Sequence, residues 1–433
     1  MSSKAALISG GETAMVPKLR FPEFRAAGVW KPISLKNAST PVIEQVGQRM
    51  LTPVSISAGI GFVRQSEKFG RDISGNQYQL YTLVRDGDFV FNKGNSLKFP
   101  QGCIYLLDGW GEVAAPNVFI CFRLKDGYSN AFFQNCFEQN QHGRQLQKDI
   151  TSGARSNGLL NISKETFFGV EILTPSLSEQ QKIADCLTSA DELIATQAEK
   201  VEALKAHKKG MMQQLFPRPE RTENGQKIPP ETKPRLRIPE FEGAGDWETA
   251  PLSQLASYEN GKAYEQDIVD AGKYVVVNSR FISTDGMVQK FSNANYLTAQ
   301  ANDVLMVLSD LPKGRALAKC YFVEADEKYG VNQRVCRLKT KGMNPRFLYL
   351  ILNRNPYLLS FDDGQNQTHL SKGNVLDCPL WFPKELKEQQ RIADSLTSLD
   401  DLIAAESIKL DTLKTHKKAL MQQLFPSPKG AET

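Results

Sequence analysis

The sequence has few of the residues on which catalytic and metal sites depend. It contains only four histidines, and its seven cysteines include no Cys-x-x-Cys pair. These counts leave little material for a zinc site, and they favour reduced thiols in a cytoplasmic protein over a disulfide framework. No apolar run approaches the ~20 residues that a membrane-spanning helix needs. The N-terminus also lacks the charged start and apolar stretch of a secretion signal.

Motifs for phosphate-binding loops are missing as well. No Gly-x-x-x-x-Gly-Lys-Ser/Thr segment occurs, and Gly59-Ile-Gly61 lacks the third glycine of a dinucleotide-binding fingerprint. His142 and His369 have no matching partners, and no His-Glu-x-x-His motif is present. We therefore predict no catalytic residue, no metal ligand and no cofactor in this chain.

The composition provides for two or three globular domains. The chain has 433 residues, of which 41% are hydrophobic and 23% charged. Its 53 basic and 48 acidic residues give a net charge of +5, which permits a nucleic-acid partner without requiring one. Residues 17–178 hold 18 basic and 13 acidic residues, whereas 234–387 hold 19 and 18. Any basic surface should therefore be stronger in the first half.

The chain is internally duplicated. Residues 179–217 align without a gap on 388–426, with 25 identities in 39 positions, and both segments begin Glu-Gln-Gln and end Met-Gln-Gln-Leu-Phe-Pro. A second repeat marks the domain starts, because Pro17-Lys-Leu-Arg-Phe-Pro-Glu-Phe24 matches Pro234-Arg-Leu-Arg-Ile-Pro-Glu-Phe241. The regions between these repeats are far less alike. The order is therefore a globular region, a helix, a second globular region and a second helix.

Both repeated segments have the pattern of long helices. Apolar residues recur at alternating steps of three and four, Ser178-Glu-Gln-Gln181 has the form of a capping box, and a proline ends each segment. Each helix should run for about 33 residues, or roughly 50 Å. The bland alternative is that they are ordinary core helices of separate domains.

Polar residues in the apolar seam favour an antiparallel pair. A parallel pair would set Lys208 against Lys417, whereas an antiparallel register sets Gln197 opposite Lys417 and Lys208 opposite Glu406. The molecule would then have a pseudo-two-fold axis within one chain.

The predicted segments are an N-terminal tail (1–16), a first globular domain (17–177), a central helix (178–217), a linker (218–233), a second globular domain (234–384), a distal helix (385–426) and a C-terminal tail (427–433).

Short β-rich runs, turns and a few helical stretches alternate in each globular domain, which predicts an α+β fold. Several turns combine Gly, Asn or Ser with a cation, as loops that contact DNA grooves do, although most such turns in proteins are merely solvated. Arg can pair with guanine edges, Asn and Gln with adenine, and Lys with phosphates. The candidate DNA-binding residues are Asn92, Lys93, Arg155, Asn157, Lys164, Lys313, Arg315, Gln367 and Lys372.

This arrangement resembles the specificity (S) subunit of type I restriction-modification systems. The resemblance lies in the two domain-start motifs, in Gly-Asp-Phe-Val (87–90), in the segments that end Ser163-Lys164 and Ser371-Lys372, and in the duplicated helices, and it covers residues 17–426. It implies two target recognition domains, separated by an antiparallel two-helix coiled coil, that each recognise half of a bipartite asymmetric site in double-stranded DNA.

The resemblance also implies partners. The coiled coil would set the spacer between the half-sites and dock two methyltransferase (M) subunits, and restriction (R) subunits would complete the complex. S-adenosylmethionine, ATP and Mg²⁺ would be used by those partners, not by this chain. Two other interpretations stay open: a non-DNA scaffold built on the duplicated helices, and a fused methyltransferase. The second requires an Asn/Asp-Pro-Pro-Tyr/Phe motif, which Asn344-Pro-Arg-Phe347 and Asn355-Pro-Tyr-Leu358 do not provide.

Overall fold

The computed structural model describes residues 16–94, 99–150, 160–218, 221–223, 226–311, 314–326 and 328–426. The chain divides into two compact units. The first unit contains the residues up to Ala198 together with those from Lys409, and the second contains Glu199–Ile408. Each unit therefore includes part of both long helices. None of the helices described combines the length and the apolar character that crossing a membrane would require.

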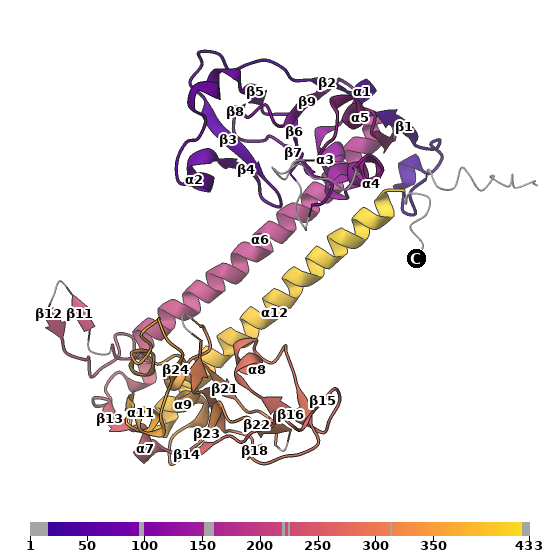
Figure 1. Cartoon of the computed structure of the whole chain (residues 1–433). Coiled ribbons are helices and arrows are strands. Elements are labelled where there is room, and N and C mark those ends of the chain that lie inside the picture. Colours follow the sequence, from indigo (N-terminus) through magenta and orange to yellow (C-terminus); the bar gives the residue numbers. More distant parts are fainter. Residues whose placement is uncertain are drawn as a thin grey trace, which may run out of the picture. The chain divides into compact units, whose positions relative to one another are not determined.

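The first unit is built from short strands and helices around the beginning of one long helix (Figure 1). Its elements are β1 (Lys31–Ser34), α1 (Leu35–Ala38), β2 (Ser39–Pro41), β3 (Thr52–Ser57), β4 (Gly61–Arg64), α2 (Gln65–Phe69), β5 (Thr82–Arg85), β6 (Asp88–Asn92), β7 (Cys103–Leu106), β8 (Glu112–Ala115), β9 (Ile120–Leu124), α3 (Asn130–Glu138), α4 (Gln141–Leu146), α5 (Lys164–Phe168), β10 (Glu171–Thr174) and the start of α6 (Leu177–Leu215), with 3₁₀ turns at Pro22–Phe24 and Gly75–Leu80.

The second unit repeats this plan. Its elements are a hairpin of β11 (Arg221–Glu223) and β12 (Gln226–Ile228), a 3₁₀ turn (Pro239–Phe241), β13 (Glu248–Pro251), α7 (Leu252–Leu255), β14 (Ala256–Asn260), β15 (Ile268–Val269), β16 (Tyr274–Val277), α8 (Ser279–Ser283), β17 (Phe291–Ser292), β18 (Thr298–Ala299), β19 (Val304–Val307), β20 (Ser309–Asp310), β21 (Cys320–Phe322), β22 (Tyr329–Val331), β23 (Val335–Thr340), α9 (Pro345–Leu352), α10 (Pro356–Leu359), β24 (Thr368–His369), α11 (Lys372–Leu376), β25 (Pro379–Phe382) and the start of α12 (Leu386–Leu424).

One four-stranded sheet has the same strand order in both units although their sequences differ. In the first, the antiparallel sheet runs β2-β9-β6-β7, and in the second β14-β23-β19-β21. A two-strand pair, β1–β10 or β13–β25, precedes each long helix. A further sheet completes each unit, β4-β3-β8-β5 in the first and β15-β17-β16-β22-β18 in the second. The α+β prediction is therefore confirmed in both halves.

The central strand of each antiparallel sheet is covered on both faces. In β19, Val304 and Met306 belong to one hydrophobic cluster, whereas Leu305 and Val307 belong to another. In β6, Phe89 and Val90 divide between two clusters in the same way. Strands with two buried faces carry continuous apolar runs instead of alternation. This accounts for the unbroken β-rich runs in the sequence.

The long helices contribute to both cores and run antiparallel within each unit. In the first unit, Ile183 and Leu187 of α6 share a cluster with Leu424 of α12. In the second, Leu215 of α6 shares a cluster with Ile392 of α12. The beginning of one helix therefore packs in the same core as the end of the other, as the antiparallel prediction requires.

Each long helix spans 39 residues, which exceeds the expected length of about 33 residues and falls slightly short of the segments 178–217 and 385–426 assigned to the helices. The expected capping box at Ser178 is wrong, because α6 already begins at Leu177 and the Ser176 hydroxyl accepts the N–H of Glu179 (3.4 Å). The predicted linker also contains the β11–β12 hairpin, which the sequence analysis missed. Its strands are joined by Asn-Gly, a sequence that favours a two-residue hairpin turn.

The polar contacts between the two helices differ from the predicted pairings. The Lys208 ammonium binds Asp400 (2.5 Å), six residues before the expected Glu406. The Lys417 ammonium binds Asp191 (2.6 Å), six residues before the expected Gln197. Glu406 instead accepts from Lys200 (2.5 Å). The prediction paired only the residues of the seam, whereas the acidic partners Asp191 and Asp400 lie on its half-exposed flanks.

Candidate nucleic-acid interface

Two of the predicted DNA-contacting loops meet in the first unit. The Leu160 N–H donates to the carbonyl of Lys93 (2.9 Å), which joins the turn after β6 to the segment before α5. We call residues 92–94 and 160–164 the first loop pair. These segments are far apart in the sequence, and each was selected for its turn residues and cations. The fold brings them side by side.

The second unit contains the equivalent pair. Strand β20 pairs with β24, and the Leu370 N–H donates to the Leu308 carbonyl (2.8 Å). Leu308 follows β19 as Lys93 follows β6, and Leu370 precedes α11 as Leu160 precedes α5. We call the described residues of 308–315 and 364–372 the second loop pair. The described segments that carry Lys93 and Lys164, and those that carry Arg315 and Lys372, are therefore joined in two matching pairs.

Asn92 shapes its loop from within. Its side-chain amide donates to the Ile56 carbonyl (2.9 Å), and its carbonyl oxygen accepts the Gly94 N–H (2.7 Å). These bonds tie the first loop pair to strand β3 and close a tight turn. Asn92 therefore positions the main chain around Lys93, which is a different task from the predicted contact with adenine.

The carboxylate of Asp310 holds the main chain of the second loop pair. It accepts the N–H groups of Leu311 (2.9 Å), Ala316 (2.6 Å) and Leu317 (3.2 Å). A Cβ atom at Gly314 would lie 2.1 Å from an oxygen of this carboxylate, so a larger residue there would have to displace it. The carboxylate ties the main chain at Leu311 to that at Ala316 and Leu317. The sequence analysis did not identify Asp310, although an acidic residue directly before Leu-Pro-x-Gly is a turn signal.

The loop opposite is ordered in the same way. The Asp362 carboxylate accepts from the Gly364 N–H (3.0 Å) and the Thr368 hydroxyl (3.0 Å), and Asp363 accepts from two further main-chain N–H groups. These hydrogen bonds lower the pKa of Asp363. The two carboxylates therefore organise the turn.

The predicted contact residues of the second loop pair lie at its surface. The Arg315 side chain is exposed, and the Gln367 amide donates to the Ser309 hydroxyl (3.0 Å), which orients it. Lys372 is exposed and its ammonium lies 5.8 Å from the centre of the Tyr258 ring. The pair thus presents a guanidinium, an amide and an ammonium group together.

The two Ser-Lys segments have a structural explanation. Ser163 and Ser371 are N-caps, and each hydroxyl accepts an N–H from the third residue of a short helix. Lys164 and Lys372 are consequently the first residues of α5 and α11, with exposed side chains. The remaining candidates, Arg155, Asn157 and Lys313, lie outside the described residues.

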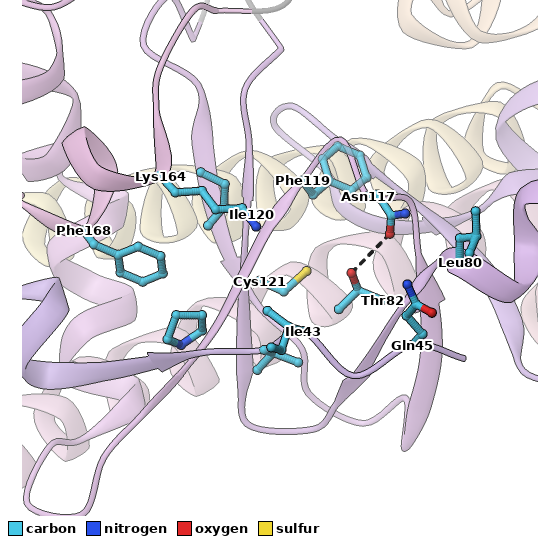
Figure 2. Close-up of a pocket in the computed structure, with 12 residues that line it drawn as sticks. Ile43, Gln45, Leu80, Thr82, Asn117, Phe119, Ile120, Cys121, Lys164 and Phe168 are labelled. Carbon is cyan, nitrogen blue, oxygen red and sulfur yellow. Dashed lines mark hydrogen bonds between the residues drawn. The ribbon is translucent and has the colours of Figure 1, made fainter. Parts of the chain in front are cut away.

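Lys164 borders a shallow recess between the sheets of the first unit (Figure 2). Polar groups of Gln45, Thr82 and Asn117 face the recess. The Thr82 hydroxyl lies 3.5 Å from the side-chain amide oxygen of Asn117. Its volume is about 150 Å³. Small-molecule sites usually enclose at least ~300 Å³. The recess is therefore too small for a nucleotide cofactor.

Other groups that could support chemistry are inaccessible or dispersed. The Cys121 thiol, which lines the recess, has its pKa raised to about 12 by burial, so it is not a thiolate at neutral pH. In the part of the chain that the structure describes, no three His, Cys, Asp or Glu side chains gather as metal ligands.

A buried ion pair holds each unit to the beginning of a long helix. Arg20 donates two hydrogen bonds to the Glu179 carboxylate (both 2.8 Å), and the Trp30 indole donates a third (3.3 Å). We call these three residues the first anchor. Arg20 also donates to the carbonyls of Ala27 and Gly28, so its guanidinium is well satisfied. Glu179 is only 1% exposed.

The second anchor repeats this geometry. Arg237 donates two bonds to Glu388 (2.8 and 2.7 Å), and the Trp247 indole donates a third (3.3 Å). The anchors explain both repeats in the sequence at once, because the arginine belongs to the Pro-x-Leu-Arg motif and the glutamate opens Glu-Gln-Gln. The sequence analysis found these motifs but did not connect them.

The glutamine after each anchor glutamate fixes a second contact. Gln180 accepts the Ser129 N–H (3.0 Å) at the start of α3, and Gln389 accepts the Asn344 N–H (2.9 Å) at the start of α9. Each unit is also covered by a phenylalanine from the end of the other helix. Phe425 packs 6.0 Å from Trp30, and Phe216 packs 6.1 Å from Trp247.

Comparison with known proteins agrees with this arrangement. A family model described as the type I restriction modification DNA specificity domain matches residues 70–206 and 244–415. The specificity subunit of the type I restriction enzyme MjaVIII from Methanocaldococcus jannaschii is 25% identical over 301 residues, which covers 64% of this chain and 66% of that protein, slightly less than two thirds of its length.

Two solved structures have a similar fold. One is the S subunit of a type I restriction-modification system from M. genitalium, with a TM-score of 0.54, 14% identity, and coverage of 96% of this chain and 100% of that one. The other is a chain from a structure on complex assembly and conformational transition of the type I restriction-modification system, with a TM-score of 0.52, 14% identity, and coverage of 92% and 98%.

Proposed function

Because the chain belongs to the type I restriction-modification DNA specificity family, we propose that each of its units recognises one half of a bipartite, asymmetric site in double-stranded DNA. The observation that supports this proposal most directly is that each unit has an equivalent loop pair. The units share strand order and anchors, whereas the residues that the loop pairs present are different. A common scaffold with two different contact surfaces suits a site whose halves differ.

The side chains of the loop pairs have the chemistry for this task. An exposed arginine such as Arg315 can donate two hydrogen bonds to guanine, and an oriented amide such as Gln367 can pair with adenine. Lys164 and Lys372 can bind phosphates, which positions a protein on the duplex without specifying sequence. We assign base recognition to Arg315 and Gln367, and phosphate contact to the two lysines.

We further propose that α6 and α12 form the coiled coil that sets the spacer between the half-sites. A helix of 39 residues is about 58 Å long at 1.5 Å per residue. The same helices would dock two methyltransferase (M) subunits, and restriction (R) subunits would join the full complex. S-adenosylmethionine, ATP and Mg²⁺ would be bound by those partners, in keeping with the absence of phosphate-loop motifs in this sequence.

The proposal is tested by co-expression with a cognate methyltransferase subunit and genome-wide mapping of N6-methyladenine. The expected result is methylation within one asymmetric motif that has two fixed halves and a constant gap. A stable complex that methylates no new motif would contradict the proposal and favour a scaffold function.

A domain exchange tests the division of labour. Residues 31–175 are replaced by the corresponding segment of another family member. Arg20, Trp30 and Glu179 lie outside this segment, so the first anchor is kept. Only one half of the methylated motif should change. A change in both halves would refute independent recognition by the two units.

A further inference from the structure

One residue of the second loop pair has an exposed apolar side chain. Leu311 is 67% exposed and directly follows Asp310. Single exposed leucines are common on protein surfaces, so exposure alone carries little weight. The position of Leu311 gives it significance, because it lies in the same loop as Arg315 and on the edge formed by β20 and β24.

The main chain of Leu311 is held in place from both sides. Its N–H donates to the Asp310 carboxylate (2.9 Å), and its carbonyl accepts the Gly314 N–H (2.9 Å). The Asp310 carboxylate also holds the returning strand of the loop through Ala316 and Leu317. These bonds hold the main chain from which the Leu311 side chain projects, and a contact that discriminates between bases needs such a fixed origin.

The neighbours of Leu311 indicate which surface it would meet. Arg315 is exposed beside it, and Gln367 is oriented across the strand pair by Ser309. These two groups have the donor pattern that suits guanine and adenine edges in the major groove. On those edges the thymine C5-methyl is the one apolar group that distinguishes the base pairs.

We infer that Leu311 is a specificity-determining residue that contacts the methyl group of a thymine in the half-site recognised by the second unit. This inference rests on the proposed DNA-binding function and adds the class of base that the loop selects. It requires the half-site to contain at least one A·T pair. A half-site made only of G·C pairs would overturn it as soon as the motif is mapped.

The test uses the complex with its methyltransferase and duplexes that carry the mapped motif. Each thymine of the second half-site is replaced in turn by deoxyuridine, which removes only the methyl group. Binding by the wild-type complex should weaken by about fourfold at one position, the effect of one buried methyl group. The Leu311→Ala complex should bind the thymine and deoxyuridine duplexes equally at that position.

Ile268→Ala provides a matched control. Ile268 is also an exposed apolar residue of the second unit, but it lies on β15 in a different sheet. This variant should retain the fourfold discrimination. Circular dichroism should show that all three proteins fold alike, because neither side chain is buried.

Three outcomes would overturn the inference. Binding could be unaffected by deoxyuridine at every position, or Leu311→Ala could still discriminate fully between thymine and deoxyuridine. The third is a rise in fluorescence, dependent on Leu311, of 2-aminopurine placed in the second half-site. The last would mean that Leu311 inserts between base steps as a wedge. Each of these outcomes presupposes a mapped motif. Failure to find any motif would contradict the proposed function itself, so the two failures are distinguishable.

Discussion

Replacing the glutamate of the second anchor should destabilise the second unit severely. In Glu388→Gln the side chain keeps its shape but loses its charge, so the Arg237 guanidinium remains buried without a counter-ion. The side chains of Arg237 and Glu388 are only 11% and 1% exposed. Breaking such a pair by removing one partner costs about 3–5 kcal/mol. Glutamine can still accept one of the hydrogen bonds, so we expect about 3 kcal/mol.

A surface pair in the same unit gives the matched control. Arg391 and Glu240 also form an ion pair (3.0 Å), but their side chains are 54% and 57% exposed. Exposed pairs contribute about 0–1 kcal/mol, so Glu240→Gln should scarcely change stability. The residue types and the substitution are identical, whereas Glu388 is buried and accepts three hydrogen bonds and Glu240 is exposed and accepts one from Arg391.

The assay is urea unfolding of the full chain followed by tryptophan fluorescence. The Trp247 indole donates to Glu388, so its emission reports on the anchor. A loss of about 3 kcal/mol lowers the urea midpoint of the second unit by about 1 M. The double variant Arg237→Met with Glu388→Leu should recover part of the loss, because no charge is then buried alone. If Glu388→Gln costs no more than Glu240→Gln, the anchor does not stabilise the unit.

Four further outcomes are expected. Lys417→Glu places two carboxylates together at Asp191 and should cost about 1 kcal/mol in urea unfolding; an unchanged midpoint would contradict the observed register. Inserting one heptad in both α6 and α12 should widen the gap in the methylated motif, and a constant gap would mean that the helices do not set the spacer. Arg315→Ala should cost about 1–3 kcal/mol in DNA binding and relax one position of the motif, whereas an equal loss on all sequences would indicate a phosphate contact. Burial lowers the pKa of His142 to about 4, so as the pH falls through about 6.5 the unfolded chain binds a proton that the folded chain does not; the first unit should be about 1.2 kcal/mol less stable at pH 5.5 than at pH 7, and His142→Gln should abolish that share of the loss.

The duplication made the helices and the order of the units predictable from sequence. Long apolar periodicities and terminal prolines define helices locally, and the structure places them at Leu177–Leu215 and Leu386–Leu424. Tertiary contacts were harder to predict from the sequence. Arg20 and Glu179 are 159 positions apart, and no local pattern links an arginine to one particular glutamate at that separation.

The predicted pairing of the two helices was wrong for a related reason. A heptad pattern repeats along the helix, so several alignments bury similar apolar layers. The choice among them was made from Gln197, Lys208, Glu406 and Lys417 alone. In the structure the lysines reach carboxylates outside the seam, because a long lysine side chain can extend along the helix surface to a flank. Flanking charges therefore needed to be included.

The candidate site was predictable as a set of segments but not as geometry. Gly, Asn and Ser beside cations selected the segments around Lys93, Lys164, Arg315 and Lys372, and the described residues of these segments meet in two pairs. Their internal order was not foreseeable in detail. The side chains of Asn92 and Asp310 form hydrogen bonds with main-chain groups of the protein, and a sequence does not reveal whether a polar side chain faces the main chain or the solvent.

The anchors also have a consequence for heredity. Each consists of the same three residue types with the same hydrogen bonds, so the two units depend on their helices in the same way. A gene segment transferred by recombination from the first half to the second would encode an arginine and a tryptophan that already fit the receiving glutamate. Under the proposed function, new combinations of half-sites would arise by such recombination without further changes in the anchors and helices.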